Sequence, residues 1–200
     1  MSFGAQQAHS FFGPLKGKTV TFLVDDRQTN LSFAKSIISL ATIAVGGCAI
    51  FDIDAFYSSN SDGILSALPS SAAGSTRVYV PEPGVRIETV LPRFFKIESG
   101  VFIVDSLNTL YHLFSSSGAS SRSRKLAFAV TSLSYLARTN EKTVLLTMYR
   151  REKAVRTGGG RSISDLSDTS VSVEAAGSEL LMRCKRGAAW PDGMLSLRIP

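Results

Sequence analysis

The sequence predicts one α/β domain in which a mainly parallel sheet is flanked by helices. Two observations support this fold class. Short apolar runs typical of buried strands alternate with longer stretches in which apolar residues recur at helical spacing. From Thr169 onward the chain instead alternates like antiparallel strands. No internal repeat or linker divides the sequence, so we expect residues 1–200 to form a single domain.

The composition is that of a basic, ordered protein. Hydrophobic residues make up 44% of the 200 positions, which is enough for a substantial core. The 22 Lys and Arg residues exceed the 16 Asp and Glu residues, and the net charge of +6 favours an anionic partner, nucleic acid first. Cys48 and Cys184 form no C-x-x-C pair, so we expect neither a disulfide framework nor a zinc site.

We expect no segment of this sequence to enter a membrane. The N-terminus lacks the basic start and long apolar core of a signal peptide. The apolar run over residues 37–51 is interrupted by Ser39, Thr42 and a Gly46-Gly47 pair. We therefore expect a cytoplasmic protein, associated with the nucleoid if it binds DNA.

The elements are expected in the following order. Apolar runs predict buried strands over residues 19–24, 48–56, 76–84, 100–107 and 143–149. Helical spacing and end signals predict helices over residues 32–47, 61–69, 85–99 (broken at Pro92), 108–114 and 126–142. Two polar stretches, residues 115–125 and 150–166, are rich in Ser, Gly and Arg and are predicted to be loops. The closing segment, residues 169–200, predicts antiparallel strands.

The stretch between the first strand and the first helix has the length of a phosphate-binding loop but not its residues. In the pattern G-x-x-x-x-G-K-[ST], the glycines let backbone N–H groups surround the phosphates and the lysine reaches the outer ones. Asp25 and Asn30 stand where the glycines would be, and Leu31 stands where the lysine would be. The whole degenerate nucleotide loop is Asp25, Asp26, Arg27, Gln28, Thr29, Asn30, Leu31 and Ser32. Each acidic contact with a triphosphate would cost roughly 4 kcal/mol before screening.

The ordered series of segments resembles the RecA/RadA recombinase core over nearly the whole chain. The stretch VFIVDS resembles the Walker B strand, in which Asp105 is the metal-associated acid and Ser106 follows. The stretch SSSGASSRSRK occupies the place of the first DNA-binding loop of that family. The strand TVLLTMY corresponds to the one that leads into the second loop, and RREKAVRTGGGRS is similar to that loop.

This resemblance implies a RecA-like three-layer sandwich and a short RadA paralogue of the kind found in archaea, without the N-terminal helical domain. The family's catalytic glutamate falls at Phe56, and its polar sensor falls at Tyr149. With the lysine also missing, the chain is expected to be a pseudo-ATPase rather than an enzyme. It is expected to use no ATP, Mg²⁺ or other metal, and Asp105 is expected to be a structural hydrogen-bond acceptor.

The resemblance also implies an accessory role in homologous recombination or repair. We expect the chain to bind DNA, single-stranded by preference, and a RadA-type recombinase or a second copy of itself. The expected nucleic-acid-binding residues are Arg122, Arg124, Lys125, Arg150, Arg151, Lys153, Arg156 and Arg161. Because neither loop offers a clear stacking ring, binding should be weak, sequence-tolerant and sensitive to salt.

Alternatives remain open at this stage. The chain could be a structural subunit of a RecA-like ring, similar to the ATPase-like Elongator subunits that hold tRNA, or a protein scaffold. A nucleotide sensor related to KaiC-type ATPases is disfavoured by Asp25 and Asp26. Phe11 and Phe12 precede the first strand and predict either a docking element for self-association or core packing. Trp190 is expected to be a packing anchor.

Overall fold

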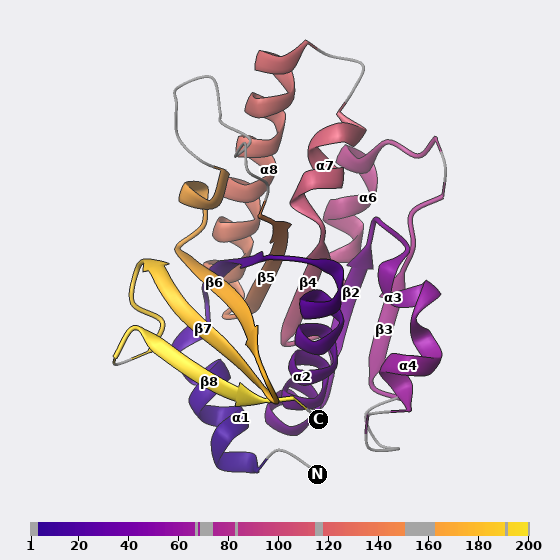
Figure 1. The fold of residues 1–200 in the computed structure, drawn as a ribbon. Helices are drawn as coiled ribbons and strands as arrows, with labels where there is room; N and C mark the ends of the chain where they lie inside the picture. The colour runs from indigo at the N-terminus through magenta and orange to yellow at the C-terminus, as the bar shows by residue number, and fades with distance from the viewer. Residues whose placement is uncertain are drawn as a thin grey trace.

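The computed structural model describes residues 4–66, 68, 74–82, 84–114, 118–150, 163–190 and 192–199. In this part of the chain, eight strands form a sheet in the order β3-β2-β4-β5-β1-β6-β7-β8 (Figure 1). Their bounds are β1 Thr19–Val24, β2 Cys48–Asp52, β3 Thr76–Tyr79, β4 Val101–Asp105, β5 Thr143–Tyr149, β6 Thr169–Ala176, β7 Glu179–Arg186 and β8 Met194–Arg198. The strands from β3 to β6 pair in parallel, and β7 and β8 add antiparallel pairs. The predicted mixed sheet is confirmed.

Helices cover both faces of this sheet (Figure 1). The helices are α1 Ala5–Phe12, α2 Arg27–Val45, α3 Phe56–Ser59, α4 Ser61–Leu65, α6 Ile87–Phe94, α7 Leu107–Leu113 and α8 Ala119–Thr139. Two short 3₁₀ turns span Gly13–Leu15 and Ile163–Leu166. The core therefore has two parts, one between the sheet and α1 and α2, and one between the sheet and α6, α7 and α8.

Alternation along the strands divides the core between the two faces. In β2, Ile50 packs with the α1–α2 side, whereas its neighbour Phe51 packs with the α6–α8 side. In β4, Ile103 and Phe102 divide in the same way. Since successive side chains of a strand point to opposite faces, a strand that is apolar at every position must be covered on both. This explains why these runs are continuously apolar.

The aromatic pair ahead of the first strand belongs to the core. Phe11 is fully buried and Phe12 is 5% exposed. The ring centroid of Phe11 lies 5.6 Å from that of Trp190 and 6.4 Å from that of Phe22. The docking interpretation of Phe11 and Phe12 is therefore wrong, and the packing role predicted for Trp190 is confirmed.

The predicted loop over residues 25–32 is wrong from Arg27 onward. Only Asp25 and Asp26 separate β1 from α2, so residues 27–32 are the first residues of that helix. The Asp26 backbone is extended, and its carboxylate accepts a hydrogen bond from the Thr29 amide, as a helix N-cap does. A cap signal two residues after the strand outweighs the similarity of this stretch to a longer loop.

Two further boundaries also differ from the prediction. Within the predicted loop over residues 115–125, residues 119–125 form the first two turns of α8, because Ser123, Leu126 and Val130 recur at helical spacing as a buried stripe. Helix α6 also continues through Pro92 instead of breaking there. The last residue of α6, Phe94, is buried, and its packing offsets the hydrogen bond that proline cannot donate.

None of the helices in the described ranges is both long and apolar enough to cross a membrane.

Candidate functional site

The carboxyl ends of β1, β4 and β5 meet the first turn of α2, and this is where sequence-predicted site residues gather. In parallel α/β sheets, ligands bind beyond the carboxyl ends of the strands. The described residues of the degenerate nucleotide loop, the Walker B-like pair and Arg150 all lie at this edge. Arg151, Lys153, Arg156 and Arg161 lie outside the described residues.

At the N-terminus of α2, the chain's own carboxylate occupies the position that favours an anion. The Thr29 amide donates to Asp26 Oδ1 at 2.7 Å, and the Asn30 amide donates to the Asp26 carbonyl at 3.0 Å. The hydrogen bond from Thr29 lowers the pKa of the Asp26 carboxyl. Helix N-termini attract anions through free N–H groups and the helix dipole. At the N-terminus of α2, the Asp26 carboxylate already accepts a hydrogen bond from one of these N–H groups, that of Thr29.

The second acid of the turn, Asp25, is held by the end of β5. The Arg150 guanidinium lies 3.1 Å from Asp25 and 3.7 Å from Glu174, and the Arg150 amide donates to the Val24 carbonyl at 2.8 Å. Arg150 therefore lies between two carboxylates and connects the β1–α2 turn, through Asp25, to Glu174 on β6. Since all three side chains are roughly 40% exposed, these ion pairs remain open to competition from solvent and salt.

Asp105, the Walker B-like acid, is fully buried at the end of β4. Thr147 donates its hydroxyl to one carboxylate oxygen, and Asn30 donates its amide to the other at 3.4 Å. Burial raises the pKa of Asp105 to about 7, despite these two hydrogen bonds. The role of structural acceptor expected for Asp105 matches this hydrogen-bonding pattern.

Asn30 and Tyr149 extend this cluster. The Asn30 side-chain amide also donates to the Tyr149 hydroxyl at 2.9 Å, while Asn108 Oδ1 accepts from the Tyr149 backbone amide at 2.8 Å. Burial raises the pKa of Tyr149 to about 12, so its hydroxyl stays neutral in the physiological range. Asn30, Asp105, Thr147 and Tyr149 thus form one polar cluster, which we call the Asp105 cluster.

The neighbouring acids Asp52 and Asp54 also accept hydrogen bonds from other residues of the chain. Asp52 is fully buried and accepts from the backbone amides of Tyr57 and Ser58 at 3.2 and 2.8 Å. Ser106 donates its hydroxyl to Asp54 at 2.8 Å. Phe56, where the resemblance led us to expect the place of a catalytic glutamate, is a core residue that is 5% exposed. In the described ranges, no group of three or more His, Cys, Asp or Glu side chains is arranged to hold a metal ion.

The basic residues predicted on the first loop lie on the first turns of α8. This helix runs back from the carboxyl ends of the strands, so its start lies at the same edge as Arg150 (Figure 1). The Arg122 guanidinium lies 5.2 Å from the centre of the Tyr111 ring. Lys125 lies 3.6 Å from the Glu88 carboxylate and 5.9 Å from the Phe114 ring, whereas Arg124 is exposed.

Sequence reasoning placed Asn30 and Tyr149 at this edge but missed how they are used. It assigned them as replacements of nucleotide-site residues, while the structure joins them by a hydrogen bond. Thr147 was missed altogether. A signal for it was present, because a polar residue in the apolar run TVLLTMY is buried and must find a partner. In the parallel register, the end of β4 supplies that partner.

Comparison with known proteins rests on structure alone. No protein-family model matches the sequence, and no curated protein matches it. Among many similar solved structures is the crystal structure of the RadB recombinase. It aligns with a TM-score of 0.67 over 98% of this chain and 94% of its own, at 14% sequence identity.

This chain has a RecA-like fold. The mainly parallel sheet with its antiparallel C-terminal extension was predicted from the order of apolar runs, and the RecA-like fold was implied by the resemblance; both are confirmed.

Proposed function

We propose that this RecA-like protein acts in recombination or repair without hydrolysing nucleotide. The observation that carries the proposal is the β1–α2 connection, where two residues join strand to helix and Asp26 caps the helix. A phosphate cradle needs several free backbone N–H groups and a cation. Here the described turn offers two carboxylates instead. Of the cations beside it, Arg150 is paired with Asp25, and Arg27 is the first residue of α2.

Three departures from an active site support the same proposal. Leu31 stands in the place of the lysine and lies in the second turn of α2. The place of the catalytic glutamate belongs to a core phenylalanine, Phe56. Tyr149 and Asn30 fill the space beside Asp105 with a hydrogen bond of their own. We infer that Asp105 serves the fold and holds no magnesium ion.

The proposed activity is binding to DNA, with a preference for single strands, and thereby modulation of a recombinase. The proposed contacts are the basic residues at the start of α8 and those after β5. Phosphate contacts by Arg and Lys provide most non-specific affinity for nucleic acid. With a net charge of +6, the whole chain also attracts polyanions at long range. A recombinase, or a second copy of this chain, is the proposed protein partner.

Fluorescence anisotropy tests the proposal on labelled single-stranded DNA, duplex DNA and tRNA over a salt series, with and without ATP and Mg²⁺. We expect single-stranded DNA to bind best and ATP to have no effect. The double variant Arg122→Ala/Arg124→Ala should weaken binding and lower the salt slope by about 0.7 for each phosphate that the variant no longer neutralises. Arg183→Ala/Lys185→Ala is the matched control, because it removes the same charge from exposed positions on β7.

The same titration separates the alternatives. An equal loss of DNA affinity in both double variants would show that only net charge matters, and it would contradict a DNA site on α8. A preference for tRNA, together with a stable hexamer in sedimentation, would favour a subunit of an RNA-binding ring. Binding that requires ATP would contradict the proposal that this protein uses no nucleotide and would leave DNA binding intact.

A further inference from the structure

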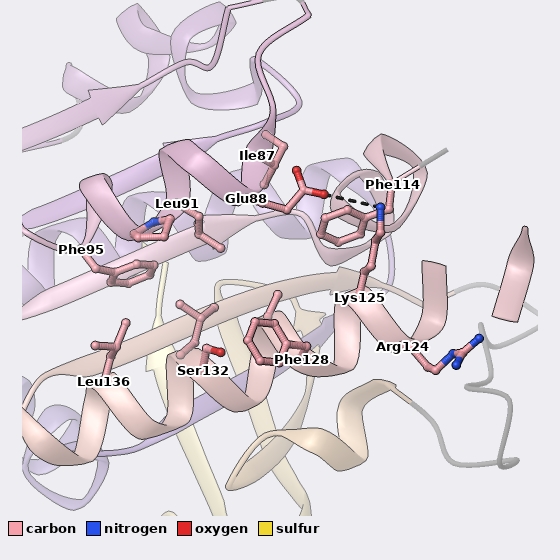
Figure 2. Close-up of a pocket in the computed structure, with 13 residues that line it drawn as sticks. Ile87, Glu88, Leu91, Phe95, Phe114, Arg124, Lys125, Phe128, Ser132 and Leu136 are labelled. Atoms are coloured by element: carbon pink, nitrogen blue, oxygen red, sulfur yellow. Dashed lines mark ion pairs between the residues drawn. The ribbon is translucent and has the colours of Figure 1, made fainter. Parts of the chain in front are cut away.

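An apolar groove runs between α6 and α8 (Figure 2), and none of its lining residues belongs to the Asp105 cluster. Its volume is about 370 Å³. Ile87 and Leu91 of α6 line it together with Phe95, which follows that helix, and Phe128 lines it from α8 (Figure 2). Phe128 is 76% exposed, more than any other large hydrophobic side chain in the described ranges. Exposed apolar surface of this kind marks interaction sites in soluble proteins.

The groove has the length and shape of a helix-binding site. Its lining residues on α8 recur every three or four positions from Lys125 to Leu136, so they form one face of the helix. At 1.5 Å per residue this face is about 16 Å long, which is roughly three helical turns. Amphipathic helices bind such grooves through apolar residues spaced three or four apart.

One end of the groove is basic. There a second hollow of about 600 Å³ shares Ile87, Glu88, Phe114 and Lys125 with the first and continues past Arg86. The charged residues that line the two hollows are Arg86, Arg124 and Lys125 against one acid, Glu88. Lys125 lies at the junction, paired with Glu88 at 3.6 Å (Figure 2). An occupant therefore needs apolar residues for the groove and acidic residues at this end.

We propose that the α6–α8 groove binds an amphipathic, acidic helix of a partner protein. A second copy of this chain fits less well, because it would bring its own net charge of +6 toward the basic end. Nucleic acid also fits less well. Its phosphates need cations along their path, whereas the cations here are gathered at one end of an apolar groove.

A designed peptide tests the proposal. The probe is a fluorescein-labelled helix of about 18 residues with Leu and Phe on one face and Glu on the flanks. Its control is the same peptide with every Glu replaced by Lys. We expect the acidic peptide to bind the whole chain with a Kd on the order of 10 μM and the lysine peptide to bind at least about tenfold more weakly.

Three variants locate the site. Phe128→Ala should weaken the acidic peptide about tenfold. Lys125→Glu should reverse the preference between the two peptides. Tyr135→Ala is the matched control, since Tyr135 is also an exposed aromatic residue of α8, 67% exposed, and does not line the groove. It should leave peptide binding unchanged, and since Phe128 and Tyr135 are both exposed, neither change should disturb folding.

Three results would overturn the proposal. The first is a failure of specificity: either both peptides bind equally well, or Phe128→Ala and Tyr135→Ala weaken binding of the acidic peptide equally. The second is dimerisation of the unmodified chain in sedimentation that Phe128→Ala abolishes, because this would assign the groove to a second copy. The third is loss of single-stranded DNA binding in Phe128→Ala, because this would assign it to nucleic acid.

Discussion

At the scale of single residues, the Asp105 carboxylate shows what the carboxyl edge of the sheet contributes to the fold. It is fully buried and accepts hydrogen bonds from Thr147 on β5 and Asn30 on α2. These hydrogen bonds connect β5 and α2 to β4. Because desolvation disfavours the charged carboxylate, burial raises its pKa from the ordinary value of 3.8 to about 7.

This raised pKa makes folding stability depend on pH. The folded protein binds the Asp105 proton more tightly than the unfolded chain does. The contribution to stability is therefore complete below about pH 4 and is lost as the pH rises through about 7. The change from 3.8 to about 7 corresponds to at most about 4 kcal/mol.

Asp105→Asn should remove this pH dependence. Between pH 4 and pH 8, the free energy of unfolding of the unmodified chain should fall by up to about 4 kcal/mol relative to that of the variant. Urea unfolding at a series of pH values measures this difference, with Asp192→Asn on the exposed surface as the control. Parallel pH profiles of the Asp105→Asn variant and the unmodified chain would contradict the buried-acid account.

At the scale of elements, both ends of α2 are determined by their local residues. Asp26 caps the start, and Gly46 with φ of 77° ends the helix in the left-handed conformation. Gly47 follows with φ of 138°, and a Cβ added there would lie 2.2 Å from the Ser75 carbonyl oxygen. Gly46, in contrast, has open space around the position of a Cβ. The close approach of the backbones, and not the turn alone, therefore requires glycine at position 47.

The two glycines give a matched pair of substitutions. Gly46→Ala should cost about 1 kcal/mol of stability, the usual penalty for an L-residue in the left-handed region. Gly47→Ala should cost more than about 3 kcal/mol, because a backbone clash adds to the conformational cost. Chemical denaturation of both variants measures the difference. Equal losses of stability in the two variants would show that the backbone at Ser75 can shift away from an added Cβ at little cost.

At the scale of the whole molecule, the order of apolar runs was enough to predict a mainly parallel sheet with antiparallel C-terminal strands. Strand runs such as VFIVD are apolar at every position before the closing acid, and that pattern requires cover on both faces. The start of α2 was missed because one polar residue, Asp26, caps it. The start of α8 was missed because its first turns are rich in Ser and Arg and Gly118 makes no side-chain cap hydrogen bond. The α6–α8 groove could not be predicted, because it depends on how two helices distant in sequence pack.

The candidate site was predictable in position but not in detail. Parallel strand order places residues after β1, β4 and β5 at one edge, so Asp25 and Asp105 were expected there. Which side chains meet at this edge depends on strand register and on where α2 begins. Because α2 begins at Arg27, Asn30 is not a loop residue; it is a buried helical residue that donates hydrogen bonds to Asp105 and Tyr149.

We infer that the start of α2 is closed to nucleotide. Titration of the purified chain with a fluorescent ATP analogue and Mg²⁺ tests it most directly, with unlabelled ATP as competitor and Asp26→Ser as a variant that keeps a capping oxygen. We expect no saturable signal up to about 1 mM for the unmodified chain. Saturable binding in the micromolar range, displaced by unlabelled ATP, would contradict it.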